Sequence, residues 1–332
     1  RRVLFRSPEI AAVGGNRLYV WHANGDAMRG FPGSTPNVMR AHPVLANIDD
    51  DPTLEVLATV SAGTAGVYAW DMKGQFVPRY PLVPAAFPGL PANIATEPIF
   101  TSPVVADADL DGRSEIYVST RFGGVFSWSG KGEARAGFPV LPEGVAVGSG
   151  GVPQHATPML ADLGGDTLNL LTGGRTAGII AHDIDGVVRD GFPVPVRRWI
   201  EAPVSVGDLD GDGSLEIVAV DESGLLYAWR DDGSLVDGFP TDLVNSGRPA
   251  AVTGDLDGDG DDEIIVASNR SRNFGAVILV FDGDGTLLDS VNVDVNVGGT
   301  PTLADLDGDG QAELIATTLR RLEDPDNPTD FP

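Results

Sequence analysis

The sequence of 332 residues is 42% hydrophobic and carries a formal net charge of −26, from 48 acidic and 22 basic residues. This surplus of negative charge excludes nucleic acid phosphates and anionic membrane surfaces as favourable partners of the whole molecule. Cysteine is absent, which excludes disulfide bonds and thiolate metal sites. We expect no membrane span, because no apolar run approaches the roughly 20 residues that a span requires.

Between its two ends the chain is internally repetitive. Residues 1–7 fit none of the repeats, and we expect them to be a non-native lead. Residues 321–332 are rich in proline and aspartate and are typical of a linker or chain-end segment. We expect residues 8–320 to form a single domain, because repeats of this length are typically added around one axis.

Each repeat predicts four short strands, A to D. Strand A is a short apolar stretch, and an acidic loop connects it to a β-branched strand B such as Ile217–Val220. Strand C ends in an aromatic residue, as in Val67–Trp70, which we expect to pack between repeats. A glycine-containing hairpin turn follows, and strand D ends in Gly-Phe-Pro at residues 30–32, 137–139, 191–193 and 238–240.

The spacing of the repeats predicts an all-β fold, a β-propeller of four-stranded blades. The acidic loops begin at residues 47, 107, 162, 208, 255 and 305, which leaves room for four strands in each of five complete repeats. The start of the chain supplies strands B to D, and its end supplies strands A and B. The two ends form either two incomplete blades of seven, or one composite blade of six. We favour seven, because strand B is present at both ends.

Four loops share the spacing Asp-x-Asp-x-Asp-Gly-x-x-Glu, in which alternate side chains converge on one point. A hard cation with about six to eight oxygen ligands suits carboxylates at positions 1, 3, 5 and 9 and a main-chain carbonyl at position 7. The predicted ligands are Asp107, Asp109, Asp111, Arg113 and Glu115; Asp208, Asp210, Asp212, Ser214 and Glu216; Asp255, Asp257, Asp259, Asp261 and Glu263; and Asp305, Asp307, Asp309, Gln311 and Glu313.

The predicted ion is Ca²⁺. These loops are not EF-hands, because position 12 is Val118, Ala219, Val266 or Ala316 and strand sequence follows. Mg²⁺ fits less well, since it prefers a small octahedral shell with several waters. Without a cation the carboxylates of one loop would repel one another, so we expect the ion to be part of the fold.

Two loops depart from this pattern. The loop of Asn47, Asp49, Asp51, Thr53 and Glu55 has an amide at position 1 and a proline at position 6, and we expect weaker binding there. The loop that begins at Asp162 has Gly164 at position 3 and Leu170 at position 9, and we expect no ion there. The chain should therefore bind four to five Ca²⁺ ions.

On these loops and the Gly-Phe-Pro segments, the chain resembles the FG-GAP or VCBS repeat family from about Pro8 to Arg320. That family includes the propellers of integrin α-subunit heads and of many secreted bacterial proteins. The resemblance implies a calcium-binding module for partner binding or adhesion, located outside the cell or on its surface. Extracellular calcium modules bind with affinities of about 10⁻⁴ to 10⁻³ M.

Strand direction predicts where a partner binds. The A–B loops and C–D turns share one face of the propeller, and the B–C loops and D–A connectors share the other. Arginines such as Arg40 fall on the second face. Because guanidinium groups bind carboxylates well, we predict that this face binds a protein or an acidic glycan. The residues of this predicted partner site are Arg121, Arg175, Arg197, Arg198, Trp199, Arg248, Arg270 and Arg272.

We expect the chain not to be an enzyme. It has four scattered histidines (His22, His42, His155 and His182) and neither a Gly-x-Ser-x-Gly elbow nor a phosphate-binding loop. The alternatives are a calcium-dependent polysaccharide lyase that resembles the pectin-degrading propeller lyases, or an accessory propeller of a secreted hydrolase. The sequence shows no convergent set of base and charge-neutralising groups for a lyase.

Overall fold

A computed structural model describes residues 9–49, 51–61, 63, 65–90, 92–121, 123–141, 156–173, 178–200, 202–243, 250–269, 275–294, 296–297, 300–306, 308 and 312–319. The predicted lead and the predicted chain-end segment lie outside these residues. The chain forms two compact units, Arg1–Pro203 and Val204–Pro332, and each is described by itself. The prediction of a single domain over residues 8–320 stays a prediction.

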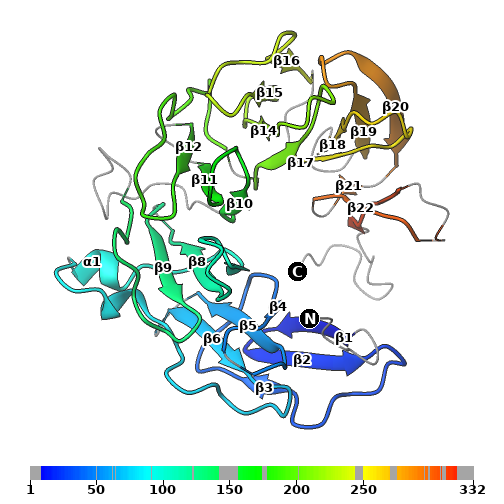
Figure 1. The fold of residues 1–332 in the computed structure, drawn as a ribbon. Coiled ribbons are helices and arrows are strands. Elements are labelled where there is room, and N and C mark those ends of the chain that lie inside the picture. Colours follow the sequence, from blue (N-terminus) through cyan, green and yellow to red (C-terminus); the bar gives the residue numbers. More distant parts are fainter. Residues whose placement is uncertain are drawn as a thin grey trace, which may run out of the picture. The chain divides into compact units, whose positions relative to one another are not determined.

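The described residues of the first unit form four antiparallel sheets of three strands each (Figure 1). They are β1(Glu9–Gly14), β2(Arg17–His22) and β3(Gly33–Ser34); β4(Val44–Ala46), β5(Glu55–Val60) and β6(Gly66–Trp70); β7(Val104–Ala106), β8(Glu115–Ser119) and β9(Val125–Ser129); and β10(Met159–Ala161), β11(Asn169–Gly173) and β12(Ile179–His182). Strand β7 lies beside both β4 and β10, so the first strands of successive sheets are neighbours.

In the part of the second unit that the structure describes, there are two sheets of four strands and two pairs of strands. They are β13(Ser205–Gly207), β14(Glu216–Val220), β15(Leu225–Trp229) and β16(Thr241–Asp242); β17(Ala250–Gly254), β18(Glu263–Asn269), β19(Ala276–Phe281) and β20(Leu287–Val293); β22(Thr302–Ala304) with β23(Glu313–Ile315); and β21(Asn296–Val297) with β24(Thr318–Leu319). Here too the first strands are neighbours, since β17 lies beside β13 and β22.

The strands follow the predicted repeat. In the first sheet, β1 to β3 correspond to strands B to D, and near the end of the chain β22 and β23 correspond to strands A and B. The all-β class and the antiparallel pairing are confirmed, but among the described residues only two sheets show the predicted four strands, and the others have two or three. In the described residues the helices are short: η1(Pro84–Ala86) and α1(Ala92–Ala95) lie in the connector after β6. None of the described helices is long and apolar enough to span a bilayer.

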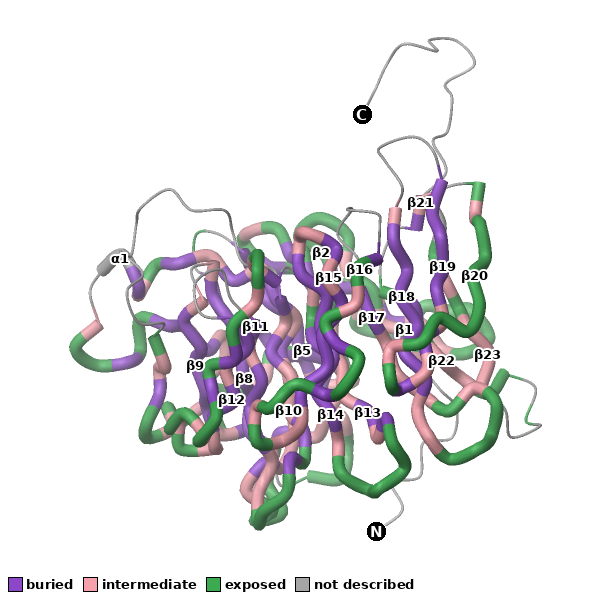
Figure 2. The backbone as a smooth tube through the Cα atoms, turned by 90° about the horizontal axis from the view of Figure 1, so that it is seen from above, coloured by how far each residue is buried: buried purple, intermediate pink, exposed green. Residues whose placement is uncertain are grey.

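Strand D of most repeats pairs with strand C only at its two ends. In the third sheet, isolated bridges join Trp128 to Ala134 and Val125 to Val140, on either side of Gly-Phe-Pro. Proline has no N–H to donate to a strand ladder, so the central part of this segment cannot pair regularly. Strand β20 contains no proline and pairs with β19 from Leu287 to Val293, with one bulge at Leu288. Figure 2 shows that it is largely exposed.

The core lies between neighbouring sheets. One cluster of the first unit joins Leu57 of β5, Ile116 of β8 and Leu170 of β11, all 0% exposed. The second unit has its own cluster, with Val218 of β14 and Ile264 of β18. Of the tryptophans of strand C, Trp70, Trp128 and Trp229 are buried as predicted, whereas Trp21 is half-buried. The indole ring of Trp70 lies against Gly33 of the preceding sheet.

Strand D also contacts the next sheet through its main chain. At Gly137, with φ +81°, an added Cβ atom would overlap with the carbonyl oxygen of Asp185 in the next hairpin turn. Gly30 has the same relation to the carbonyl oxygen of Lys73, and Gly238 to that of Asp284. Glycine is needed there because the backbone is left-handed and the neighbouring main chain leaves no space for a side chain.

We therefore expect Gly137→Ala to destabilise the protein far more than Gly25→Ala. Gly25 has a similar φ of +87°, but nothing lies within 4 Å of an added Cβ atom, so its replacement carries only the backbone cost of about 1–2 kcal/mol. Urea unfolding followed by tryptophan fluorescence should place the midpoint of Gly137→Ala clearly below that of Gly25→Ala. Equal midpoints would show that the contact with the Asp185 turn does not stabilise the fold.

Candidate metal sites

Each acidic loop connects the first and second strands of a sheet, and the strand register brings its two ends together. In the third sheet Glu115, the first residue of β8, pairs with Ala106, the last residue of β7. Glu55, Glu216, Glu263 and Glu313 occupy the same place in their sheets. The predicted position 9 is therefore the first residue of a strand, and its side chain points back into the loop.

The glutamate at position 9 closes the loop in the same way in five sheets. One carboxylate oxygen accepts a hydrogen bond from the backbone N–H at position 2: Ile48 to Glu55 at 3.1 Å, Ala108 to Glu115 at 3.0 Å, Leu209 to Glu216 at 2.9 Å, Leu256 to Glu263 at 2.7 Å and Leu306 to Glu313 at 2.6 Å. The side chains of Glu55, Glu115, Glu216 and Glu263 are buried, and burial raises the pKa of all four. For Glu55 the pKa rises to about 7.

The aspartates use one oxygen each to shape the loop. In the third sheet Asp109 accepts from the N–H of Asp111, Asp111 accepts from the N–H of Arg113, and Asp107 accepts from the N–H of Gly112 through Oδ2. In the Asp208 loop, Asp208 Oδ2 accepts from Gly213 and Asp212 accepts from Ser214. Each of these backbone contacts uses one carboxylate oxygen of its aspartate.

The oxygens Asp107 Oδ1 and Asp208 Oδ1 are buried and have no hydrogen-bond partner. A buried carboxylate oxygen without a partner is costly, so it calls for a cation or a donor. Each belongs to a group of three carboxylates with oxygen atoms within 4.8 Å of one another. The groups are Asp49, Asp51 and Glu55; Asp107, Asp109 and Glu115; Asp208, Asp210 and Glu216; and Asp255, Asp257 and Asp259. An all-oxygen set of this kind fits a hard divalent cation.

The structure thus brings three predicted carboxylates together in each of four loops. Asp111 and Asp212 at position 5, and Glu263 at position 9, lie outside these close groups. Asp261, a predicted carbonyl ligand, has its side chain against Gly211 of the preceding loop. Of the loop that begins at Asp305, the described residues include Asp305 and Glu313, whereas Asp307, Asp309 and Gln311 lie outside them.

In the Asn47 loop, Asn47 replaces the first aspartate as an organiser of the loop. Its side-chain oxygen accepts from the N–H of Asp49 at 3.2 Å, and its amide nitrogen donates to the carbonyl of Asp51 at 2.6 Å. Thr53 donates its N–H to Asp51. The loop therefore keeps its shape, but it brings one negative charge fewer to an ion than its neighbours do.

In the Asp162 loop the structure corrects which residue stands at position 9. The sequence places Leu170 at position 9, but the strand register pairs Asn169 with Ala161, just as Glu115 pairs with Ala106. This loop is one residue shorter, and an amide stands where the others have a carboxylate. The guanidinium group of Arg189 donates to Asn169 Oδ1 at 2.8 Å and to the carbonyl oxygens of Leu163 and Gly164 at 3.1 and 3.3 Å.

Sequence reasoning also missed Arg135. Its guanidinium nitrogen lies 3.1 Å from Asp109 Oδ2 and 3.1 Å from Glu115 Oε1, inside the carboxylate group of the Asp107 loop. The side chain of Arg135 is 15% exposed. Arg135 lies in strand D, 20 residues beyond the end of the loop, so loop spacing carries no signal for it.

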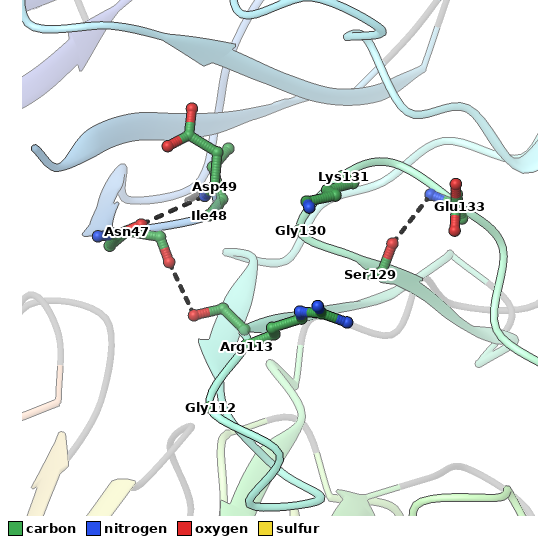
Figure 3. A pocket seen from close by; sticks show the side chains of 10 residues that line it. Asn47, Ile48, Asp49, Gly112, Arg113, Ser129, Gly130, Lys131 and Glu133 are labelled. Carbon is green, nitrogen blue, oxygen red and sulfur yellow. Dashed lines mark hydrogen bonds between the residues drawn. The ribbon is translucent and has the colours of Figure 1, made fainter. Parts of the chain in front are cut away.

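Adjacent loops contact one another. The Ser114 hydroxyl donates to the carbonyl of Asn47 at 2.8 Å, and the N–H of Leu168 donates to the carbonyl of Ala108 at 3.0 Å. In the second unit the N–H of Asp262 donates to the carbonyl of Asp208. A pocket of about 280 Å³ lies between the Asn47 and Asp107 loops and also borders Lys131 and Glu133 of a hairpin turn (Figure 3).

The described residues of the predicted partner site lie at the strand ends away from these loops. Arg121 follows the end of β8, whereas the Asp107 loop enters its start, and the Arg121 N–H donates to the carbonyl of Pro98. Arg197 and Arg198 are exposed, and the Arg198 guanidinium lies 5.7 Å from the centre of the Trp199 ring. Arg175, Arg248, Arg270 and Arg272 lie outside the described residues.

His182 takes the place of the strand C tryptophan and is 1% exposed. Burial lowers its pKa, so the neutral imidazole is favoured. His22 lies at the end of β2, with Nδ1 3.8 Å from Glu9.

Comparisons with known proteins bear on the repeats and on the fold. The model of the FG-GAP-like repeat matches twice, at residues 208–266 and 255–316. The chain therefore carries two FG-GAP-like repeats, both in the second unit and both beginning at an acidic loop. Among curated protein sequences, none matches.

Several solved structures are similar. The V. cholerae biofilm matrix protein Bap1 is 17% identical, with a TM-score of 0.58 over 81% of this chain and 42% of that chain. BBS1N, in complex with ARL6DN, is 13% identical, with a TM-score of 0.57 over 94% and 84%. A europium-containing methanol dehydrogenase is 13% identical, with a TM-score of 0.52 over 90% and 71%. At this identity the likeness concerns the fold alone, which is propeller-like, and the chain spans less than half the length of Bap1.

The raised pKa of Glu55 predicts a pH dependence for the calcium-free protein. Burial is the main cause, and the charges of Asp49 and Asp51 add to it, while the hydrogen bond from Ile48 opposes it. The folded protein binds this proton more tightly than the unfolded chain. The stabilisation is therefore full below about pH 4.5 and is lost as the pH rises through about 7.

In excess chelator, we expect the melting temperature of the wild type to fall between pH 5 and pH 7.5. Glu55→Gln keeps an acceptor for Ile48 without the charge, so it should fall less steeply. Glu133→Gln, at an exposed glutamate, is the control and should follow the wild type. If the melting temperature of Glu55→Gln falls with pH as steeply as that of the wild type, protonation of Glu55 does not cause the pH dependence.

Proposed function

We propose that the chain is a calcium-binding β-propeller of the FG-GAP type that acts outside the cell as a non-catalytic binding or adhesion module. The observation that carries the proposal is the repeated loop geometry. A glutamate closes five of the loops and aspartates shape them. Asp107 and Asp208 each have a buried oxygen without a hydrogen-bond partner, and each residue belongs to a close group of carboxylates.

Calcium is the ion that these loops suit best. The carboxylates at positions 1, 3, 5 and 9 and the main-chain carbonyl at position 7 would supply its ligands, and the ion would neutralise carboxylates that otherwise repel one another. Mg²⁺ prefers a compact octahedral shell that keeps several waters, which suits a carboxylate-rich loop less well. Five Ca²⁺ ions would move the formal charge from −26 to about −16.

A closed propeller accounts for the sheet order. The first strands of successive sheets are neighbours, as they are around the axis of a propeller. Within the described residues the first sheet has strands B to D, and β22 and β23 supply strands A and B. We propose seven blades, of which two are incomplete, with six and a composite closing blade as the alternative.

The proposed location follows from the ion. Extracellular calcium modules bind at about 10⁻⁴ to 10⁻³ M, far above cytosolic calcium levels. Loops of this kind would therefore be loaded outside the cell or at its surface.

The proposed partner is an acidic glycan or a carboxylate-rich protein loop, bound at the strand ends away from the calcium loops. Exposed Arg197 and Arg198 offer planar guanidinium donors, and Trp199 offers a ring face beside Arg198. Among the similar structures, BBS1N is in complex with ARL6DN, so a propeller-like fold of this kind can hold a protein partner.

The calcium proposal predicts a large difference in stability with and without the ion. The melting temperature should be higher in millimolar Ca²⁺ than in excess chelator, and calorimetric titration should count four to five sites. Asp208→Asn should remove or weaken one site, whereas the matched change Asp162→Asn should leave the count unchanged. An identical melt in calcium and chelator would contradict the metal assignment.

The partner proposal predicts that Arg197→Ala combined with Arg198→Ala weakens binding to polygalacturonate by about tenfold or more, since two charge-assisted contacts are lost. Lys73→Ala is the control, because Lys73 is exposed and lies in the hairpin turn after β6, at the same strand ends as the acidic loops. This variant should bind as the wild type does. Unchanged binding by the double variant would exclude this face. An assay for unsaturated uronate products on the same samples tests the absence of lyase activity.

A further inference from the structure

One position of strand D is equivalent in five of the described sheets. There the N–H of a strand D residue donates to the strand C carbonyl that immediately precedes the aromatic or histidine residue: Met28 to Val20, Val77 to Ala69, Arg135 to Ser127, Arg189 to Ala181 and Val236 to Ala228. Met28 and Val236 are buried in core clusters, and Val77 packs against a third cluster. The other two sheets have arginine at this position.

Arg189 holds the Asp162 loop together. Its guanidinium contacts three oxygen atoms: the side-chain oxygen of Asn169 and the carbonyls of Leu163 and Gly164. Asn169 is 4% exposed and stands in the register of the closing glutamate. A positive group thus binds the oxygens of a loop that lacks two of the usual carboxylates.

Arg135 reaches the Asp107 loop in the same way, but this loop has kept its carboxylates. One guanidinium nitrogen bridges Asp109 and Glu115, at 3.1 Å from an oxygen of each. Both residues belong to the group whose oxygens lie within 4.8 Å of one another. A calcium ion lies roughly 2.3–2.6 Å from its ligand oxygens, so ion and guanidinium cannot share the space between these two.

We propose that these arginines are internal cations of the metal loops: Arg189 replaces the ion in the Asp162 loop, and Arg135 competes with it in the Asp107 loop. The Asp107 loop has a complete set of carboxylates but binds calcium more weakly than the Asp208 loop, because the ion must first displace Arg135. The inference rests on the proposed calcium function and adds an order of affinity among the sites.

The test is a titration of Ca²⁺ into the calcium-stripped full chain and into Arg135→Met. Methionine fills similar space without the charge. One site of the variant should bind calcium about tenfold or more tightly than in the wild type, because no charge-assisted hydrogen bonds need to be broken. Adding Asp109→Asn to the variant should abolish that gain, which assigns it to the Asp107 loop.

Arg189→Met is the matched control. It removes the same type of cation from a loop without the carboxylates to bind an ion. Its melting temperature should therefore fall by the same amount in calcium and in chelator. Arg135→Met should instead widen the gap between the two melting temperatures, because the calcium-free form loses its counter-charge and the loaded form does not need it.

The inference is overturned if Arg135→Met leaves every calcium affinity and the melting gap as in the wild type, while the wild type still binds calcium. It is also overturned if Arg189→Met widens the gap as Arg135→Met does. A wild type that binds no calcium at all is a different result, which removes the proposed function itself.

Discussion

A hydrogen bond between the glutamate at position 9 and the backbone N–H at position 2 fixes the geometry of five of the acidic loops. It ties the first residue of strand B to the second residue of the loop, so the backbone between them curls. The curl turns the aspartates inward, and their own backbone contacts use one oxygen each. Closure also buries the carboxyl groups of Glu55, Glu115, Glu216 and Glu263, and burial raises their pKa.

The sequence predicted the strands and the loops well, because both depend on local patterns. Alternating aspartates, a turn glycine and a β-branched stretch identify the loop and strand B wherever they occur. The sequence did not reveal that Asn169, and not Leu170, closes the Asp162 loop, because only strand pairing shows that this loop is one residue short. Arg135 and Arg189 escaped it as well, since side chains from strand D reach the loops only in the folded sheet.

The acidic loops are also connected to one another within each unit. Residues just before the closing glutamate of one loop donate to main-chain carbonyls of the preceding loop, as Ser114 does to Asn47 and Asp262 does to Asp208. The curl of one loop therefore positions a contact of its neighbour. The charges of one loop also act on the next. Desolvation and Asp259 are the main causes of the raised pKa of Asp261, and Asp208 and Asp210 of the preceding loop raise it further.

The contact between strand D and the next hairpin turn joins main chain to main chain, and it leaves the surrounding side chains largely unspecified. Gly137 needs only to lack a side chain, and Asp185 contributes a carbonyl that any residue could supply. The second sheet has Arg79 in place of the glycine, at φ 72°, and that side chain reaches across to the carbonyl of Lys131. Repeats joined in this manner can drift far apart in sequence while the spacing of their sheets stays the same.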